Sequence, residues 1–233
     1  METTGPAEIR FRDEAWNLRM PDQVQLIGGR LRFPVKPGGG LEGYVGGYRG
    51  SPMGRYDMEL WAAEQALKAA NVVFRPGLNE DLAATAIWGP QYVGTFPGAK
   101  VEGVFGIWYG KGPGVDRSGD VLRHANQAGT SPKGGVLCLA GDDHGAKSSS
   151  VANFSDPVFM AVGMPVLYPS NTQELLDYGL HGIAMSRFSG CWVGMKVVTD
   201  VVEGGGSVYV GADAPLITVP EAPSRPLGPF GAG

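Results

Sequence analysis

The chain has 233 residues, 43% of them apolar, which is enough for one large domain with a real core. Its net charge is −4, from 19 basic and 23 acidic residues, and no basic block is present, so nucleic acid is not an expected partner. No apolar run reaches the roughly 18 residues that a membrane span needs, and the polar N-terminus does not resemble a signal peptide. We therefore expect a cytoplasmic protein that does not bind membranes.

Hydrophobic patterning divides the chain into three parts. Residues 1–42 predict an arm and linker, with a possible hairpin at 24–33, and residues 204–233 predict a Gly- and Pro-rich tail with a disordered end at 223–233. Residues 43–203 alternate between strand-like and helix-like patterns. The predicted strands are 44–48, 71–74, 103–108, 135–140, 165–168 and 191–198, with 207–210 and 216–219 in the tail. The predicted helices are 56–70, 79–93, 116–128 and 170–187.

This βαβα order predicts an α/β fold with three layers, in which helices flank a mostly parallel sheet. Asn79 is suited to be the N-cap of its helix, and Ser170 with Gln173 fits a capping box. Ligands of such folds bind at the carboxyl ends of the strands. The loops that follow these ends are 47–54, 75–80, 109–119 and 141–150.

The first candidate site residue is Glu80, which opens a helix of otherwise small and apolar residues. A partly buried carboxyl of this kind favours its protonated form and can share a proton with a ligand nitrogen. The alternative is an ordinary acid at a helix N-terminus, where it complements the helix dipole.

Two further loops carry residues suited to binding. In 48–54, Arg49 could bind a carboxylate and Ser51 offers a hydroxyl, although an ordinary strand-to-helix turn explains the loop equally well. In 108–116, the glycines of Gly112-Pro113-Gly114 allow the backbone to approach a ligand closely. Neither a Walker motif nor the GxGxxG spacing is present.

The fourth loop, 141–150, gathers acids, an imidazole, an amine and hydroxyls directly after a buried strand. Such a cluster at a strand's carboxyl end favours a site. A hydrolase built on Asp142, His144 and Ser148 is an alternative, although the Gly-x-Ser-x-Gly elbow is absent. His144 and His124 lack metal-ligand spacing, so no metal site is expected.

The two cysteines, Cys138 and Cys191, are far apart in the sequence and do not form a CxxC pair. An iron–sulfur cluster takes about four thiolates, so this chain alone cannot hold one. We expect two apolar thiols and no disulfide.

Long segments of the domain resemble the N-terminal part of indolepyruvate ferredoxin oxidoreductases, which belong to the 2-oxoacid:ferredoxin oxidoreductases and use thiamine diphosphate. The resemblance runs from about residue 43 to 203. It is carried by YRGSPMGRYDMELW, FRPGLNEDLAATAIWGPQ, GVFGIWYGKGPGVDRSGDVLRHANQAGTSPKGGVLCLAGDDHGAKSS, GMPVLYPSNTQELLDYGLHGIAMSR and CWVGMKVVTD.

The resemblance implies a pyrimidine-binding domain in which Glu80 is catalytic and binds the aminopyrimidine ring of the cofactor. It implies that Gly112, Pro113 and Gly114 shape the pocket around that ring. Arg49, Ser51, Asp143, His144 and Lys147 are then the expected substrate-binding residues, on the side of the 2-oxoacid. The implied reaction is oxidative decarboxylation of an aryl 2-oxoacid to an acyl-CoA, with ferredoxin as the electron acceptor.

Enzymes of that family are far longer than this chain. Their diphosphate-binding domain carries a Gly-Asp-Gly motif and the magnesium, and their ferredoxin-like cysteine clusters carry iron and sulfur. None of these is found here. The resemblance therefore implies partner domains or subunits that supply these parts, in an oligomer. A non-catalytic remnant or assembly module that keeps the fold is the alternative.

Overall fold

The computed structural model describes residues 7–9, 41–53, 55–95, 97–209 and 217. The hairpin predicted at 24–33 and the disordered end predicted at 223–233 lie outside the described residues. The strand predicted at 216–219 lies outside them too, except for Ile217.

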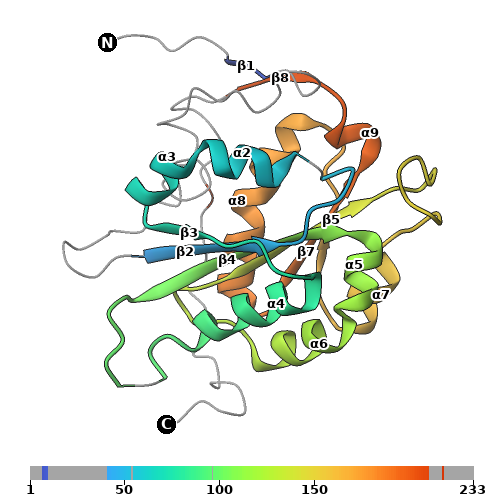
Figure 1. The fold of residues 1–233 in the computed structure, drawn as a ribbon. Coiled ribbons are helices and arrows are strands. Elements are labelled where there is room, and N and C mark those ends of the chain that lie inside the picture. Colours follow the sequence, from blue (N-terminus) through green and yellow to red (C-terminus); the bar gives the residue numbers. More distant parts are fainter. Residues whose placement is uncertain (1–6, 10–40, 54, 96, 210–216, 218–233) are drawn as a thin grey trace.

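A six-stranded parallel sheet forms the centre of the described fold (Figure 1). Its strands, in spatial order, are β3 (Val72–Phe74), β2 (Leu41–Gly47), β4 (Gly103–Lys111), β5 (Val136–Asp142), β7 (Val193–Val198) and β6 (Val166–Leu167). The chain leaves β2 toward β3 on one side and later returns to build β4 and β5 on the other. The order therefore reverses between β2 and β4, and ligands of open α/β sheets bind at the carboxyl ends beside such a reversal.

Helices cover both faces of the sheet, so the predicted three-layer α/β fold is confirmed (Figure 1). One face carries α2 (Tyr56–Ala62), α3 (Glu64–Ala69) and α8 (Thr172–Ser189). The other carries α4 (Glu80–Trp88), α5 (Gly112–Arg117), α6 (Gly119–Ala128) and α7 (Asp156–Ala161). The remaining elements are the 3₁₀ helix η1 (Gly89–Tyr92), α9 (Thr199–Val202) and a small antiparallel ribbon of β1 (Ala7–Ile9) and β8 (Gly206–Val208).

Each face of the sheet has its own apolar core, because successive side chains of a strand point to opposite faces. On the α2 side, the ring of Tyr109 packs edge-on against Tyr56 at 5.1 Å. On the α4 side, Trp108, Phe159 and Trp192 are fully buried. The strands β4 and β5 are buried almost throughout, as expected for the centre of a parallel sheet.

Several boundaries differ from the predictions. The helix predicted at 56–70 is two helices separated at Ala63, and the one predicted at 79–93 leaves the α-helical conformation after Trp88 and continues as η1, with Pro90 in its first turn. The helix predicted at 116–128 begins at Gly112, and a further short break separates α5 from α6. Its start was missed because Gly-Pro-Gly looks like a turn, although proline is tolerated in a first helical turn.

The start of α8 corrects the predicted capping box by one position. Asn171, and not Ser170, is the N-cap, and its Oδ1 accepts from the backbone N of Glu174 at 3.0 Å. The Glu174 carboxylate in turn accepts from the backbone N and the Oγ of Ser170, at 2.7 and 2.8 Å. At α4, the predicted N-cap is confirmed, because Asn79 Oδ1 accepts from Leu82 N at 2.9 Å.

Candidate functional site at the carboxyl edge of the sheet

Glu80 is held at the reversal of strand order by its own backbone. It is the first residue of α4, and its carbonyl oxygen accepts a 2.9 Å hydrogen bond from Trp108 Nε1. Trp108 is fully buried in β4, so this bond ties the start of the helix to the centre of the sheet. The Glu80 side chain is half-buried, and no hydrogen bond from the described part of the chain reaches its carboxylate oxygens.

Gly114 makes room for the Glu80 side chain. A Cβ atom on Gly114 would lie 2.5 Å from Cγ and 2.8 Å from Oε1 of Glu80, so only glycine fits there without movement. Gly110 also borders this side chain, because a Cβ there would touch the same Cγ at an ordinary 3.4 Å, although its closest neighbour would be the Trp108 ring at 2.7 Å. The carboxylate therefore rests against the backbone at the end of β4 and the start of α5.

The other residues of the Gly112-Pro113-Gly114 motif lie differently. Gly112 is buried against Asn153, whose Oδ1 occupies the place that a Cβ on Gly112 would take, and Pro113 is exposed. Of the three predicted pyrimidine-pocket residues, the structure therefore brings only Gly114 against Glu80.

The loop after β2, the loop after β5 and the residue that follows α9 meet at the end of β4, on the face opposite to Glu80. Ser51 Oγ, in the loop after β2, donates to Glu203 Oε1 at 3.2 Å. Lys147 Nζ, in the loop after β5, donates to Glu203 Oε2 at 3.1 Å. Lys111 packs its stem against Gly50 and donates from Nζ to the carbonyl of Ser148 at 3.1 Å. Ser51 and Lys147 are thus brought to one carboxylate, and Arg49 lies exposed in the first of these loops.

Asp143 organises the loop after β5. Its carboxylate accepts from the backbone N of Lys147 at 2.9 Å, from the backbone N of Ser148 at 2.8 Å and from Ser148 Oγ at 3.3 Å. These bonds, led by that of the Ser148 backbone, hold the pKa of Asp143 below its usual range. The residue is buried, so the structure gives it a role in shaping the loop, whereas His144 is exposed.

The geometry does not support the hydrolase alternative. Ser148 Oγ donates to Asp143, and within the described residues no hydrogen bond joins Ser148 to His144. Asp142, the third member of that arrangement, points its carboxylate into the interior and is fully buried. A nucleophile, a base and an orienting acid in one chain of hydrogen bonds are therefore not assembled.

A buried charged network behind this loop was not found from the sequence. Asp142 Oδ2 accepts from the backbone N and Oγ of Ser155, at 2.8 and 3.1 Å. Lys196 Nζ lies 2.7 Å from Asp156 Oδ2 and 4.0 Å from Asp142 Oδ2. Burial raises the pKa of the Asp142 carboxyl. The signal in the sequence was a lone lysine inside the apolar strand 193–198, which in a buried strand needs a partner.

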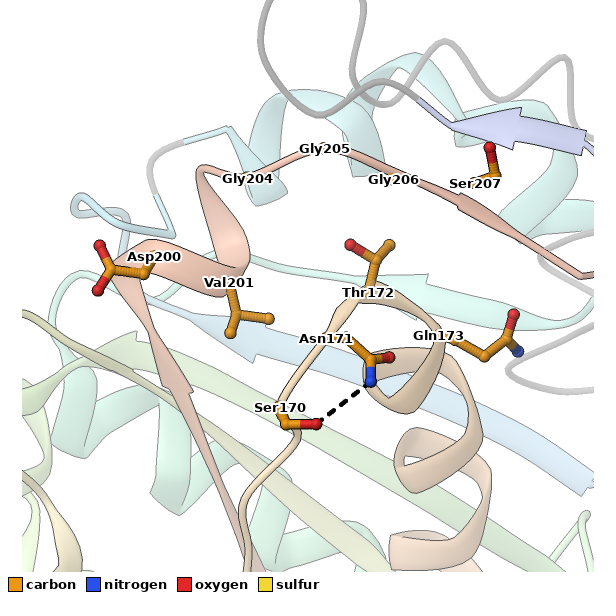
Figure 2. A pocket seen from close by; sticks show the side chains of 10 residues that line it. All are labelled: Ser170, Asn171, Thr172, Gln173, Asp200, Val201, Gly204, Gly205, Gly206 and Ser207. Carbon is orange, nitrogen blue, oxygen red and sulfur yellow. Dashed lines mark hydrogen bonds between the residues drawn. The ribbon is translucent and has the colours of Figure 1, made fainter.

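Figure 2 shows a hollow at another part of the same edge, where the start of α8 faces the chain between α9 and β8. Its volume is about 300 Å³. It is lined by small and polar residues. Among them, Asn171 Nδ2 donates a 3.2 Å hydrogen bond to Ser170 Oγ, which is the dashed line in Figure 2. None of the predicted site residues lines it.

The described residues include no group of three or more His, Cys, Asp or Glu side chains that could hold a metal ion. Cys138 is buried, Cys191 is partly buried, and both are free thiols. No helix within the described ranges has the length and apolarity required to cross a bilayer.

Comparisons with known proteins find similarity in structure alone. No protein-family profile and no curated protein sequence matches the chain. The fold is similar to that of 2-oxoglutarate:ferredoxin oxidoreductase from Magnetococcus marinus, solved with 2-oxoglutarate, coenzyme A and succinyl-CoA bound, with a TM-score of 0.56 and 16% identity. The match covers 80% of this chain and 30% of that one. Transketolase from Leishmania mexicana matches over 53% of this chain and 20% of its own, with 16% identity and a TM-score of 0.38, too low to carry an argument.

The first comparison bears on the fold predicted from the sequence. The 2-oxoglutarate:ferredoxin oxidoreductase contains a region with a similar arrangement of sheet and helices, which agrees with the α/β fold predicted from the sequence. At this level of identity the similarity shows the fold and not the activity. The chain spans about a third of the length of the protein it matches.

Proposed function

We propose that this chain is the pyrimidine-binding domain of a thiamine-diphosphate-dependent 2-oxoacid:ferredoxin oxidoreductase. We further propose that its substrate is an aryl 2-oxoacid of the indolepyruvate kind, that coenzyme A accepts the acyl group, and that ferredoxin accepts the electrons. The observation that carries the proposal is the position of Glu80. Its carboxylate lies at the reversal of strand order, packed on Gly114, with no hydrogen bond from the described residues.

The residues present fit the aminopyrimidine end of the cofactor. A carboxyl group that its own chain leaves without a hydrogen-bond partner can bind a ring nitrogen, and the glycines beside it allow a planar ring to approach the backbone. Bound thiamine diphosphate supplies the electron sink for the decarboxylation. Glu80 would hold or release a proton at the ring nitrogen, and the Trp108 bond would keep its helix from moving as it does so.

The proposed binding site for the substrate carboxylate lies at the end of β4, on the face opposite to Glu80. The cationic head of Lys147 and the Ser51 hydroxyl converge there and are suited to a carboxylate. Arg49 and His144 stand exposed in the two flanking loops and are proposed to close on the substrate. Asp143 is proposed to act through the loop that it holds, and Gly112 and Pro113 through the backbone turn that leads to Gly114.

The diphosphate, the magnesium and the iron–sulfur clusters are proposed to reside on partner domains or subunits, in a cytoplasmic oligomer. The share of the M. marinus enzyme that this fold matches, 30%, is consistent with a larger assembly.

The test is turnover by the protein purified with whatever partner chains accompany it. Indolepyruvate, thiamine diphosphate, magnesium and coenzyme A are added, and reduction of a low-potential dye is followed. We expect dye reduction that requires all four additions, together with iron in the preparation. A lone 24.5 kDa species without iron and without turnover would instead favour a non-catalytic module that keeps the fold.

A further inference from the structure

Glu203 lies between two of the side chains proposed to bind substrate. Its Oε1 accepts from Ser51 Oγ at 3.2 Å, and its Oε2 accepts from Lys147 Nζ at 3.1 Å. Each oxygen of this carboxylate therefore receives one hydrogen bond, from loops that are far apart in the sequence. A free 2-oxoacid presents the same group, a carboxylate with two acceptor oxygens, to the same two donors.

We propose that Glu203 is a built-in occupant of the substrate-carboxylate subsite, and that a 2-oxoacid binds by displacing it from Ser51 and Lys147. This inference rests on the proposed function for the identity of the ligand. Glu203 then limits which ligands bind, because a ligand that displaces it must bring its own carboxylate to pair with Lys147.

The ion pair between Lys147 and Glu203 is weak enough for a ligand to displace it. The Lys147 side chain is 69% exposed and that of Glu203 is 38% exposed, so water screens the ion pair and can take over its hydrogen bonds. Glu203 directly follows α9, and three glycines, Gly204-Gly205-Gly206, come after it. Glycines restrict the backbone least, so the segment that carries Glu203 can shift without moving the sheet.

The walls of the subsite do not depend on Glu203. Lys111 joins the two loops by itself, because its stem packs on Gly50 and its Nζ donates to the carbonyl of Ser148. Asp143 holds the backbone of Lys147 from the other side, at 2.9 Å. Ser51 and Lys147 therefore stay near each other when Glu203 leaves.

The experiment measures equilibrium binding of two ligands to the full chain, by calorimetry or by shifts of NMR signals. One ligand is phenylpyruvate, and the other is the matching ketone, phenylacetone, in which a methyl group replaces the carboxylate. In Glu203→Gln, we expect phenylpyruvate to bind at least threefold more tightly than in the wild type, with no change for the ketone. Adding Lys147→Ala to Glu203→Gln should abolish the gain.

Glu102→Gln is the matched control, because it neutralises a carboxylate of another exposed ion pair, that with Lys133, just before β4 at the opposite edge of the sheet. It should leave both affinities unchanged. Thermal unfolding of every variant shows whether the fold is kept.

Weaker or unchanged phenylpyruvate binding in a folded Glu203→Gln would overturn the inference, and so would the absence of binding by both wild type and variant. An equal gain for the ketone would also overturn it, since a loosened loop and not a freed carboxylate subsite would then be responsible. The result is independent of turnover. A gain that persists in Glu80→Gln/Glu203→Gln, alongside failure of the turnover test, would remove the proposed function while leaving the carboxylate subsite in place.

Discussion

Trp108 Nε1 donates a 2.9 Å hydrogen bond to the carbonyl oxygen of Glu80, and so joins the proposed catalytic residue to a fully buried side chain of β4. The bond crosses 28 residues of sequence. It serves the backbone of Glu80 and leaves the carboxylate unengaged. The buried core thereby fixes the position of the Glu80 backbone at the start of α4, while the carboxylate stays free to bind a ligand.

Replacing Trp108 with phenylalanine removes this donor and leaves the Glu80 carbonyl with its bond inside α4 alone. We expect a loss of about 1–3 kcal/mol in the free energy of unfolding, together with a fall in kcat of about tenfold as α4 loses its anchor. Trp192→Phe is the matched control, because Trp192 is also fully buried but its Nε1 has no hydrogen-bond partner among the described residues. It should lose similar stability and keep kcat. Equal losses of kcat in the two variants would contradict a positioning role for Trp108.

Gly114→Ala should damage the site more than the fold. The new Cβ would lie 2.5 Å from Glu80 Cγ, so the Glu80 side chain must move, and overpacking of this kind costs about 1–3 kcal/mol. Gly119→Ala, at the start of α6, meets only ordinary contact at 3.9 Å and should be neutral or slightly stabilising. Turnover and thermal unfolding measured on both variants decide the matter, and full activity in Gly114→Ala would show that the position of Glu80 is not critical.

The buried carboxyl of Asp142 predicts a dependence of stability on pH. Burial raises its pKa above the ordinary 3.8, so its protonated form contributes stability that is complete below the ordinary value and is lost as pH rises through the folded value. Asp142→Asn should remove that loss and be neutral or stabilising at pH 7, because an amide can still accept from Ser155. Asp142→Ala should cost about 1–3 kcal/mol by leaving the Ser155 donors unpaired. Denaturant unfolding from pH 4 to 8 tests both, and a strong destabilisation by Asp142→Asn across that range would refute the prediction.

Asp143 predicts the opposite dependence. Its pKa is lowered by the hydrogen bonds it accepts, so the order that it gives the loop is present above the ordinary value of 3.8 and is lost as pH falls through the lower, folded value. Protection of the Lys147 and Ser148 amides, whose N–H groups it binds, should be high at pH 5 and be lost only well below pH 4, when hydrogen exchange is compared with the intrinsic rate at each pH. In Asp143→Ala, both amides should be unprotected at every pH. Protection in that variant would mean that other contacts hold the loop.

The sequence predicted most of the fold because its central strands are short apolar runs. The runs at 103–108 and 135–140 lie in β4 and β5, and the order of strands and helices led to a parallel sheet with helices on both faces. The short helix α7, with only six residues, was missed, since a segment of that length shows no helical period.

The candidate site was predictable where it depends on local sequence and not where it depends on distant contacts. Glu80 could be found because a glutamate opening an apolar helix is a local pattern. Glu203 could not, because its partner Ser51 is 152 residues away and nothing near Glu203 indicates the contact. The pairing of Lys196 with Asp156, 40 residues apart, was hidden for the same reason.

We propose that Glu80 transfers a proton at the cofactor, and the rate of this transfer can be measured without any substrate. The hydrogen on the reactive thiazolium carbon of thiamine diphosphate exchanges with deuterium from solvent, and its rate is measured on the purified assembly, with wild-type chain or with Glu80→Gln. We predict that the variant folds like the wild type and exchanges this hydrogen at least 100-fold more slowly, within the range of about 10²–10⁴ that general acid–base catalysis contributes. Equal exchange rates in the two proteins would show that Glu80 does not transfer this proton.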